Sequence, residues 1–324
     1  MCYKDEDQAR AKYKLEEKIK DMPKFIKDYF KTLSSNKSKL TYWSTIRLFF
    51  EWLIDKKIIN KPLEGIMPED LVIVTHFDLV DYLEGIKASP DTIITKMNLI
   101  RSFWSYLIDN GYSQKNIVTK KVIQKFKVEK MDKDIELPTD EQLQSVLNNL
   151  ESIKSEIISI RNISIAKLFI GTAMRLSELV GLDIDDLHFE REIPEITIWA
   201  KGKKRSRDVV VSQSAIDAIN DYLIIRNSYP ELKHLKPLFL SEHKDDDGNN
   251  KRISVSTVEK FFDKYSNGQI HPHKLRDYAA TKMYESNHDI VGVSEQLGHS
   301  DINITRKRYV KANKNNMFTA LNSF

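Results

Sequence analysis

IHPHKLRDYAATKMY (residues 270–284) and EQLGHSDINITRKRYV (residues 295–310) form the stretch around which the rest of this chain is organised. Each part holds side chains suited to a phosphodiester: His273, Arg276, His299 and Tyr309. Arginine stays charged and binds phosphate oxygens through paired hydrogen bonds. Histidine can donate a hydrogen bond or move a proton near neutral pH, and tyrosine can attack as a nucleophile. His271 competes with His273 for the histidine role.

A third segment, GTAMRLSEL (residues 171–179), lies upstream and has Arg175 at its centre. Arg175 follows residues 156–174, which read as a buried helix, and a charge beside such a segment needs a partner. Glu178 would serve as that partner in an ordinary salt bridge. Histidine and tyrosine have equally plain structural uses. The hypothesis of a phosphate-ester site therefore depends on the whole set of residues and on their order.

A basic turn lies between these segments. The strand-like runs IPEITIWA (193–200) and DVVV (208–211) flank KGKKRSR (201–207), which is a hairpin signature. A charge run is usually a solvated face. A hairpin tip rich in lysine also suits a DNA groove, where one lysine could protonate a leaving oxygen. The candidates are Lys201 first, then Lys203 and Lys204.

Size and composition narrow the class of protein. The chain has 324 residues, which favours two domains. Its 51 Lys and Arg against 47 Asp and Glu give a net charge of only +4, so the overall charge says little about a nucleic-acid partner. The single cysteine, Cys2, excludes an internal disulfide framework and a Cys-rich metal site. No run is apolar enough for a membrane span or a signal core. We therefore expect a soluble, cytoplasmic protein without a membrane contact.

The first part of the chain reads as helical. Residues 1–20 are charged, and we expect a solvated helix or a frayed arm. Residues 21–126 carry apolar side chains at helical spacing and predict an α-helical domain. Its clearest helix has Ser89 as N-cap, Pro90 at the first position and Gly111 at the stop. The aromatic stripe of that helix predicts a core and not a platform for stacking bases.

A domain boundary is predicted next. Residues 127–137 are charged and lack an apolar face, which indicates a linker. Thr139 and Gln142 are spaced as a capping box and open a second domain, residues 138–324. The predicted fold class is mainly α with a small β-hairpin or sheet, in two domains. Further helices are predicted at 23–33, 39–54, 75–85, 156–174, 213–226, 256–266, 276–287 and 291–297, with a short strand at 237–240.

Taken together, these segments resemble the tyrosine recombinase family of phage-type integrases, Xer recombinases and conjugative-transposon integrases. The resembling boxes are GTAMRLSEL, AKGKKRSR (200–207), PHKLRDYAAT (272–281) and LGHSDINITRKRY (297–309). The resemblance covers most of residues 138–312, whereas the N-terminal part matches only in size, helical character and position. Asp277 departs from the histidine that often follows the second arginine of the family. The hairpin segment is longer than the family pattern, which leaves the choice of lysine open.

The resemblance implies an α-helical core-binding domain and an α+β catalytic domain, with these roles. Arg175 and Arg276 would clamp the scissile phosphate, and Glu178 would brace Arg175. Lys201 would protonate the departing 5′ oxygen. His273 would assist proton transfer, and His299 would donate a hydrogen bond to a phosphate oxygen. Tyr309 would attack and form a 3′-phosphotyrosyl intermediate.

The resemblance also implies partners. These are double-stranded DNA with a specific recombination site and a homo-tetramer that joins two such sites, with room for accessory DNA-bending proteins. Candidates for contacts of the N-terminal domain with DNA are Lys37, Lys39, Lys96 and Arg101. The apolar tail residues Met317, Phe318 and Leu321 are candidates for docking on a neighbouring protomer.

We expect no cofactor and no metal. A phosphotyrosine preserves the energy of the phosphodiester, so rejoining needs no ATP, and the sequence has no phosphate-binding loop of the GxxxxGK[ST] type. The arginines would supply the positive charge that Mg²⁺ supplies elsewhere. We read the acidic loop Asp245–Asp247 as a solvated turn.

Three other interpretations stay open on the sequence. The first is a catalytically silent, sequence-specific DNA-binding regulator on the same scaffold. The second is a type IB topoisomerase, which shares the chemistry. The third is a soluble helical protein whose motif matches arise by chance. The role also stays open between integration or excision of a mobile element and resolution of replicon dimers.

Overall fold

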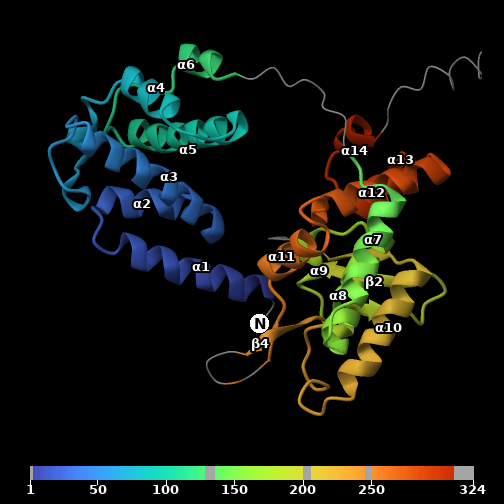
Figure 1. Ribbon diagram of the computed structural model, residues 1–324. Coiled ribbons are helices and arrows are strands. Elements are labelled where there is room, and N and C mark those ends of the chain that lie inside the picture. Colours follow the sequence, from blue (N-terminus) through green and yellow to red (C-terminus); the bar gives the residue numbers. More distant parts are fainter. Residues whose placement is uncertain (1–2, 128–135, 200–205, 245–247, 249, 310–324) are drawn as a thin grey trace, which may run out of the picture. The chain divides into compact units, whose positions relative to one another are not determined.

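The computed structural model describes residues 3–127, 136–199, 206–244, 248 and 250–309. The chain divides into two compact units, Met1–Lys133 and Asp134–Phe324. Helices dominate both units, and the only strands in the described ranges form two small antiparallel sheets of the second unit (Figure 1). This confirms the predicted fold class. No helix in the part that the structure describes is long and apolar enough to cross a membrane.

The first unit, which we call the N-terminal unit, is all helical. Its helices are α1 (Tyr3–Ile19), α2 (Lys24–Thr32), α3 (Asn36–Asp55), α4 (His76–Glu84), α5 (Pro90–Asp109) and α6 (Lys120–Lys125), with 3₁₀ turns at Leu63–Gly65 and Pro68–Leu71. Helices are present where the sequence predicts them. Ser89 caps α5 by accepting a hydrogen bond from the Thr92 N–H, and Gly111 follows the helix in the left-handed region with φ of 75°.

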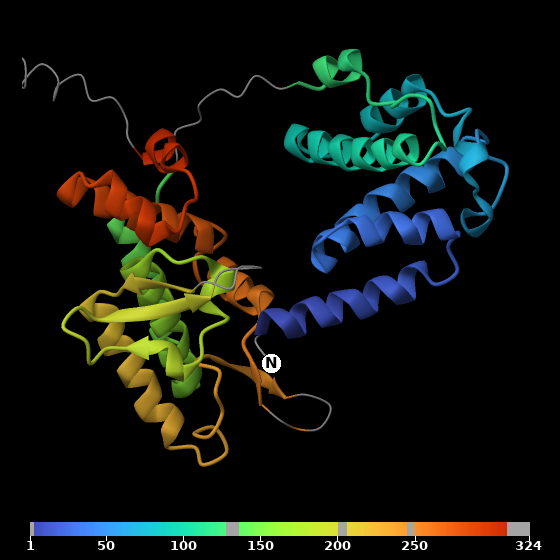
Figure 2. The ribbon, with the colours of Figure 1, turned by 180° about the vertical axis from the view of Figure 1, so that it is seen from behind.

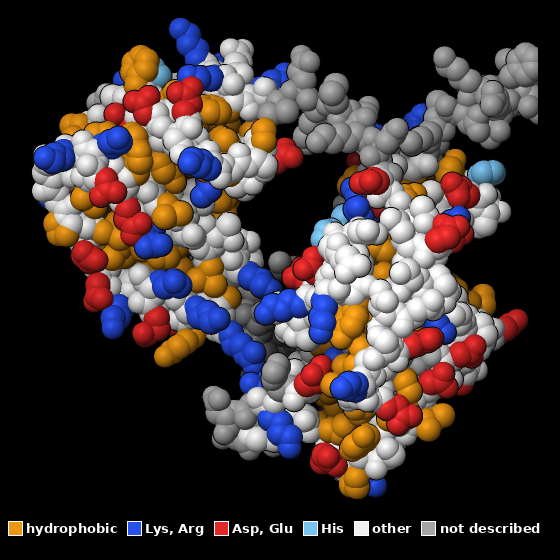
Figure 3. Space-filling view, viewed as in Figure 1, with side chains coloured by type: hydrophobic (Ala, Val, Ile, Leu, Met, Phe, Trp, Pro, Cys, Tyr) orange, Lys and Arg blue, Asp and Glu red, His pale blue; other side chains and the backbone are white. Residues whose placement is uncertain are grey.

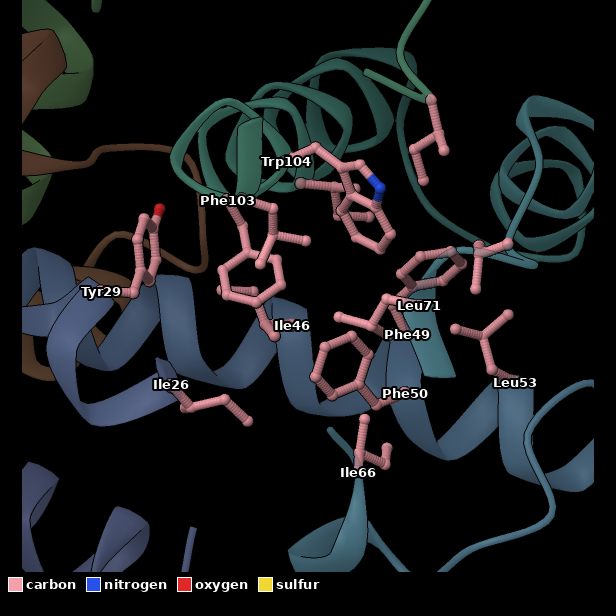
Figure 4. Packing of buried hydrophobic residues seen from close by; sticks show 14 of the residues in the cluster. Ile26, Tyr29, Ile46, Phe49, Phe50, Leu53, Ile66, Leu71, Phe103 and Trp104 are labelled. Carbon is pink, nitrogen blue, oxygen red and sulfur yellow. The ribbon is translucent and has the colours of Figure 1, made fainter. Parts of the chain in front are cut away.

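Aromatic side chains build the core of the N-terminal unit. Phe103 and Trp104 of α5 face Phe49 and Phe50 of α3 (Figure 4). Tyr29 of α2 meets Phe103 edge-on, with ring centroids 5.0 Å apart. The aromatic stripe of α5 is therefore core, as predicted.

The charged segment at the start of the chain contributes to this core. Within α1, Ala11, Leu15 and Ile19 recur every fourth residue and are buried. Leu15 and Ile19 belong to the same core cluster as the aromatic residues. The helix is therefore solvated on only part of its surface. Its many charged residues hide the buried apolar positions in the sequence.

The second unit, which we call the C-terminal unit, mixes helices with two small sheets. Its helices are α7 (Asp140–Glu151), α8 (Glu156–Thr172), α9 (Leu176–Leu179), α10 (Gln213–Asn227), α11 (Val255–Tyr265), α12 (Pro272–Asn287), α13 (Ile290–Leu297) and α14 (Ile302–Tyr309), with a 3₁₀ turn at Ile184–Asp186. Its strands are β1 (Leu187–His188), β2 (Glu195–Trp199), β3 (Ser206–Val210), β4 (Leu240–Lys244) and β5 (Asn250–Arg252). Thr139 and Gln142 form the predicted capping box at the start of α7.

The larger sheet has the order β1-β2-β3, and α8 and α10 cover one of its faces (Figure 2). β2 and β3 form the predicted hairpin, in register with Ile196 opposite Val209. Alternation places Ile196 and Ile198 in the core. Helix α8 approaches α10 closely at Gly171, where a Cβ would lie 2.8 Å from that of Ala215.

Several boundaries differ from prediction, and two of them have a plain physical reason. The strand expected at 237–240 begins only at Leu240, because Pro237 has no N–H for a ladder and makes just an isolated bridge with Asp183. Helix α12 begins at Pro272 and not at Arg276, since proline suits the first position of a helix. Other predictions lie outside the described residues: most of the linker, the hairpin lysines, the acidic loop 245–247 and the apolar tail.

Candidate active site

A left-handed turn positions Arg175. Helix α8 is closed by Ala173, whose φ of 53° turns the chain sharply, and Arg175 then caps the short helix α9. Glu178 accepts the backbone N–H of Arg175 at 2.7 Å and its Nη1 at 3.0 Å. The salt bridge weighed from the sequence is therefore present, and it fixes the arginine at both ends of the residue.

Glu178 also binds a second arginine. Arg207 of β3 donates from Nη2 to Glu178 Oε2 at 3.1 Å, the same oxygen that accepts the backbone N–H of Arg175. Burial acts to raise the pKa of Glu178, but the guanidinium groups of Arg207 and Arg175 outweigh it and hold the pKa below its ordinary value. The carboxylate is thus a buried anion that anchors two arginines.

Arg276 of α12 connects separate parts of the site. Its side chain is buried, and it donates from Nη1 to the Ala173 carbonyl at 2.5 Å and from Nη2 to the Leu297 carbonyl at 2.8 Å. Burial, and then the charge of Arg175, lowers the pKa of Arg276 to about 10. The guanidinium remains charged at neutral pH.

The C-terminal end of α13 gathers all three arginines. Three successive carbonyls each accept one guanidinium: Gln296 from Arg207 at 2.7 Å, Leu297 from Arg276 at 2.8 Å and Gly298 from Arg175 at 3.2 Å. Carbonyls at a helix C-terminus lack partners within the helix and carry partial negative charge, so cations are stabilised there. We call these residues the arginine hub.

His299 follows the arginine hub in sequence and contacts helix α14. Its Nδ1 lies 2.8 Å from Thr305 Oγ1, and its Nε2 lies 3.4 Å from Arg276 Nη2. Burial, and then the charges of Arg276 and Arg175, lowers the pKa of His299 to about 4. The ring is therefore neutral at physiological pH. It is suited to hydrogen bonding and not to carrying charge.

Tyr309 closes α14 and is buried, with 7% of its surface exposed. Its hydroxyl donates to Asp277 Oδ1 at 2.8 Å. The same carboxylate accepts Arg308 Nε at 2.8 Å and Arg308 Nη2 at 2.6 Å. Burial, reinforced by the negative charge of Asp277, raises the pKa of Tyr309 well above that of a free phenol. His273 is exposed, and its Nε2 lies 3.3 Å from Arg308 Nη2.

The structure brings most of the predicted set together. Arg276 links the segments that carry Arg175 and His299, while Tyr309 and His273 share a hydrogen-bonded network through Asp277 and Arg308. His271, the competing histidine, is the exposed N-cap of α12. Lys201, Lys203 and Lys204 lie outside the described residues. No cluster of metal-binding side chains occurs in the ranges that the structure describes.

Sequence reasoning missed Arg207 as a separate site residue, because it was counted with the solvated turn. A usable signal was present: in β3, Arg207 stands two residues before the buried Val209, so alternation places both on the inner face. Asp277 was noted only as a departure from a motif.

The N-terminal candidates for DNA contact lie on two helices, Lys37 and Lys39 on α3 and Lys96 and Arg101 on α5. Lys37 and Arg101 are exposed, while the other two are partly covered. Lys and Arg side chains are interspersed with Asp and Glu over much of the visible face of this unit (Figure 3). Charge alone therefore does not single out a contact residue.

Comparison with known proteins matches residues 137–316 to the phage integrase family. Tyrosine recombinase XerS of Streptococcus uberis is 29% identical over 90% of this chain and 93% of its own. Tyrosine recombinase XerC of Psychromonas ingrahamii is 31% identical over 69% of this chain and 70% of its own. Among solved structures, the post-cleavage complex of XerH site-specific recombinase with palindromic difH substrate superposes with a TM-score of 0.65. It shares 23% identity and covers 89% of this chain and 80% of its own.

Proposed function

Because the chain belongs to the phage integrase family of tyrosine recombinases, we propose that the residues around the arginine hub cleave and rejoin DNA in site-specific recombination. One observation carries the assignment of residues. Arg276 donates to the backbone of the Arg175 segment and to that of the His299 segment, so three motifs distant in sequence share one site. A duplex phosphate is the ligand that best suits two converging guanidiniums beside a neutral imidazole.

In the proposed reaction, Arg175 and Arg276 bind the non-bridging oxygens of the scissile phosphate. The Arg175 side chain is 42% exposed, and each guanidinium has five N–H donors, so the contacts within the protein leave donors for a phosphate. The paired charges stabilise the additional negative charge of the pentacoordinate transition state. His299, which is neutral, serves as a hydrogen-bond donor to a third position on the phosphate.

The covalent step exchanges one phosphate ester for another. The Tyr309 oxygen bonds to phosphorus, the bond from phosphorus to the 5′ oxygen breaks, and the phenol proton passes to His273 as the proposed acceptor. Lys201 is the proposed general acid that protonates the 5′ oxygen, and His273 is proposed to assist proton transfer at the nucleophile. Rejoining reverses these steps, with the 5′ hydroxyl attacking the 3′-phosphotyrosyl bond.

A nicked suicide substrate tests this proposal. The short cleaved fragment diffuses away, so the covalent complex accumulates and is visible on a denaturing gel. Tyr309→Phe should abolish the adduct. Tyr278→Phe is the matched control, since this α12 tyrosine donates to Asp140 at 2.5 Å outside the arginine hub, and it should retain the adduct. Absence of any wild-type adduct on a site that the protein binds would instead favour a silent DNA-binding regulator.

We propose further that both units bind the same duplex, with a core-binding domain at 21–126, a linker at 127–137 and a catalytic domain at 138–324. Substituting Lys37, Lys39, Lys96 and Arg101 together by glutamine should weaken DNA binding and make it less dependent on salt. Each lost phosphate contact lowers the slope of log K against log salt by about one. An unchanged slope would show that these residues do not contact the DNA phosphates.

We propose an assembly in which four protomers join two DNA sites. Met317, Phe318 and Leu321 belong to a tail that would dock on a neighbouring protomer. Deleting residues 314–324 should reduce synapsis in a gel-shift assay while leaving binding to a single site intact. Full recombination by the truncated protein would contradict the proposal. Mapping the genomic DNA to which the wild-type protein crosslinks would identify the site and with it the biological role.

A further inference from the structure

Asp277 is a buried carboxylate that the proposed reaction does not use. It is only 3% exposed, and three donors converge on it: the Tyr309 hydroxyl and two nitrogens of Arg308. Asp277 lies on α12 and its donors lie at the end of α14. The carboxylate therefore fastens the last turn of α14, which carries the nucleophile, to the helix that carries Arg276.

The position of Tyr309 is poorly suited to attack. Its ring packs in a cluster with Ala173, Ala279, Ala280, Val293 and Leu297, and its hydroxyl proton is engaged by Asp277. A duplex phosphate is bulky and charged, so it has to meet the phenol at the surface. A nucleophile that is 7% exposed must first leave this cluster.

We propose that Asp277 is a positioning residue that holds Tyr309 in a resting state, and that cleavage requires the bond from the phenol to Asp277 to be exchanged for contact with the DNA phosphate. The proposal rests on the assignment of Tyr309 as nucleophile. Arg308 orients the carboxylate through two hydrogen bonds, and 38% of its side chain is exposed. A phosphate entering the site can compete for this guanidinium, which would link release of the nucleophile to DNA binding.

Single-turnover cleavage of the nicked substrate, at saturating protein, provides the test. Asp277→Asn keeps the shape of the side chain but removes its charge, and Asp277→Ala removes the acceptor. A hydrogen bond to a charged group is strong enough that its loss should accelerate adduct formation on the order of tenfold. The dissociation constant for DNA should stay the same or fall, because the phosphate no longer has to compete with Asp277 for Arg308.

Asp140→Asn is the matched control. Asp140 accepts the hydroxyl of Tyr278, the neighbour of Asp277 in sequence, so this substitution removes another bond between tyrosine and aspartate in the same unit. Its adduct rate should equal that of the wild type. Unchanged or slower cleavage by both Asp277 variants, with normal DNA binding, would overturn the proposal, because the carboxylate would then support the nucleophile or be neutral to it.

A second measurement uses the wild-type protein and stays available if the variants fail to fold. In protein labelled with ¹³Cζ-tyrosine, the Tyr309 resonance can be assigned from the spectrum of Tyr309→Phe. We expect a hydrogen-bonded phenol in the free protein and a changed resonance on an intact, unnicked site. A resonance that does not respond to bound DNA would overturn the proposal. Failure of the wild type to form any adduct would instead contradict the proposed function.

Discussion

Arg207 Nη2 donates to Glu178 Oε2 at 3.1 Å, and this contact ties strand β3 to the turn that carries Arg175. Glu178 is the shared anchor, because its carboxylate also binds the backbone and the guanidinium of Arg175. Strand β3, which follows the basic turn, and Arg175, for which we propose phosphate binding, are therefore positioned by one buried anion.

Glu178→Gln should impair both stability and cleavage. Removing the charge leaves two guanidiniums without their counterion, and breaking a buried pair typically costs about 3–5 kcal/mol. We expect a loss of unfolding free energy at the lower end of this range, since Arg175 is partly exposed, measured by urea denaturation. Adduct formation on the nicked substrate should fall by roughly tenfold or more, because Arg175 is no longer held in place.

The pH dependence of this variant provides its control. The pKa of Glu178 is lowered in the folded protein, so its stabilising contribution is complete above the ordinary carboxyl pKa. The contribution is lost as the pH falls through the lowered value. The difference in stability between wild type and Glu178→Gln should therefore shrink in acid. A constant difference from neutral to acidic pH would show that Glu178 acts through packing.

Arg207→Lys should slow cleavage although it preserves charge. Arg207 spans the Gln296 carbonyl and the Glu178 carboxylate, and a lysine ammonium cannot reproduce this planar fork. We expect the single-turnover rate to fall by about tenfold with little change in DNA affinity. Arg191→Lys is the matched control, because Arg191 forms a partly exposed ion pair with Glu195 of the same sheet, and its substitution should leave the rate unchanged. Equal rates for wild type and Arg207→Lys would show that the Arg207 guanidinium is not needed for cleavage.

These arginines show how far the sequence can be read. Arg175, Arg276 and Tyr309 could be singled out as candidates from the sequence because each stands in a motif with fixed spacing. Helix caps such as Ser89 and Thr139 were accessible because a cap is a local property. Arg207 was not, since a basic run looks the same whether its last residue faces solvent or an interior carboxylate.

Asp277 and Thr305 illustrate a second limit of prediction from the sequence. Their partners are Tyr309 and His299, and which side chains meet depends on how α12, α13 and α14 pack. Such contacts are set by tertiary structure and not by any periodicity of the chain. The same applies to the short strands β1 and β5, which are too brief to leave an alternating pattern.

His299 should titrate far below an ordinary histidine. Burial and the charges of Arg276 and Arg175 lower its pKa to about 4 in the folded protein. The folded state thus binds fewer protons than the unfolded state between pH 6.5 and about 4, and stability is lost as the pH falls through this window. NMR of the imidazole ring, assigned with His299→Gln, measures the value directly. A ring that titrates at the ordinary pKa would contradict the described environment.

Gly298→Ala should lower the free energy of unfolding by more than the cost of a left-handed backbone conformation. Gly298 has φ of +63°, and a Cβ there would lie 2.5 Å from Arg207 Nε, so the substitution strains the turn and displaces the arginine. Gly268→Ala separates the two effects, because Gly268 has φ of +74° but its nearest neighbour, Asp263 Oδ1, would be 3.7 Å away. Both variants should lose about 1–2 kcal/mol of unfolding free energy from the left-handed conformation. Only Gly298→Ala should lose more than this and also slow adduct formation, as Arg207→Lys does. Equal losses in the two glycine variants, with unimpaired cleavage, would show that the approach of Arg207 to residue 298 is not needed to hold the arginine hub together.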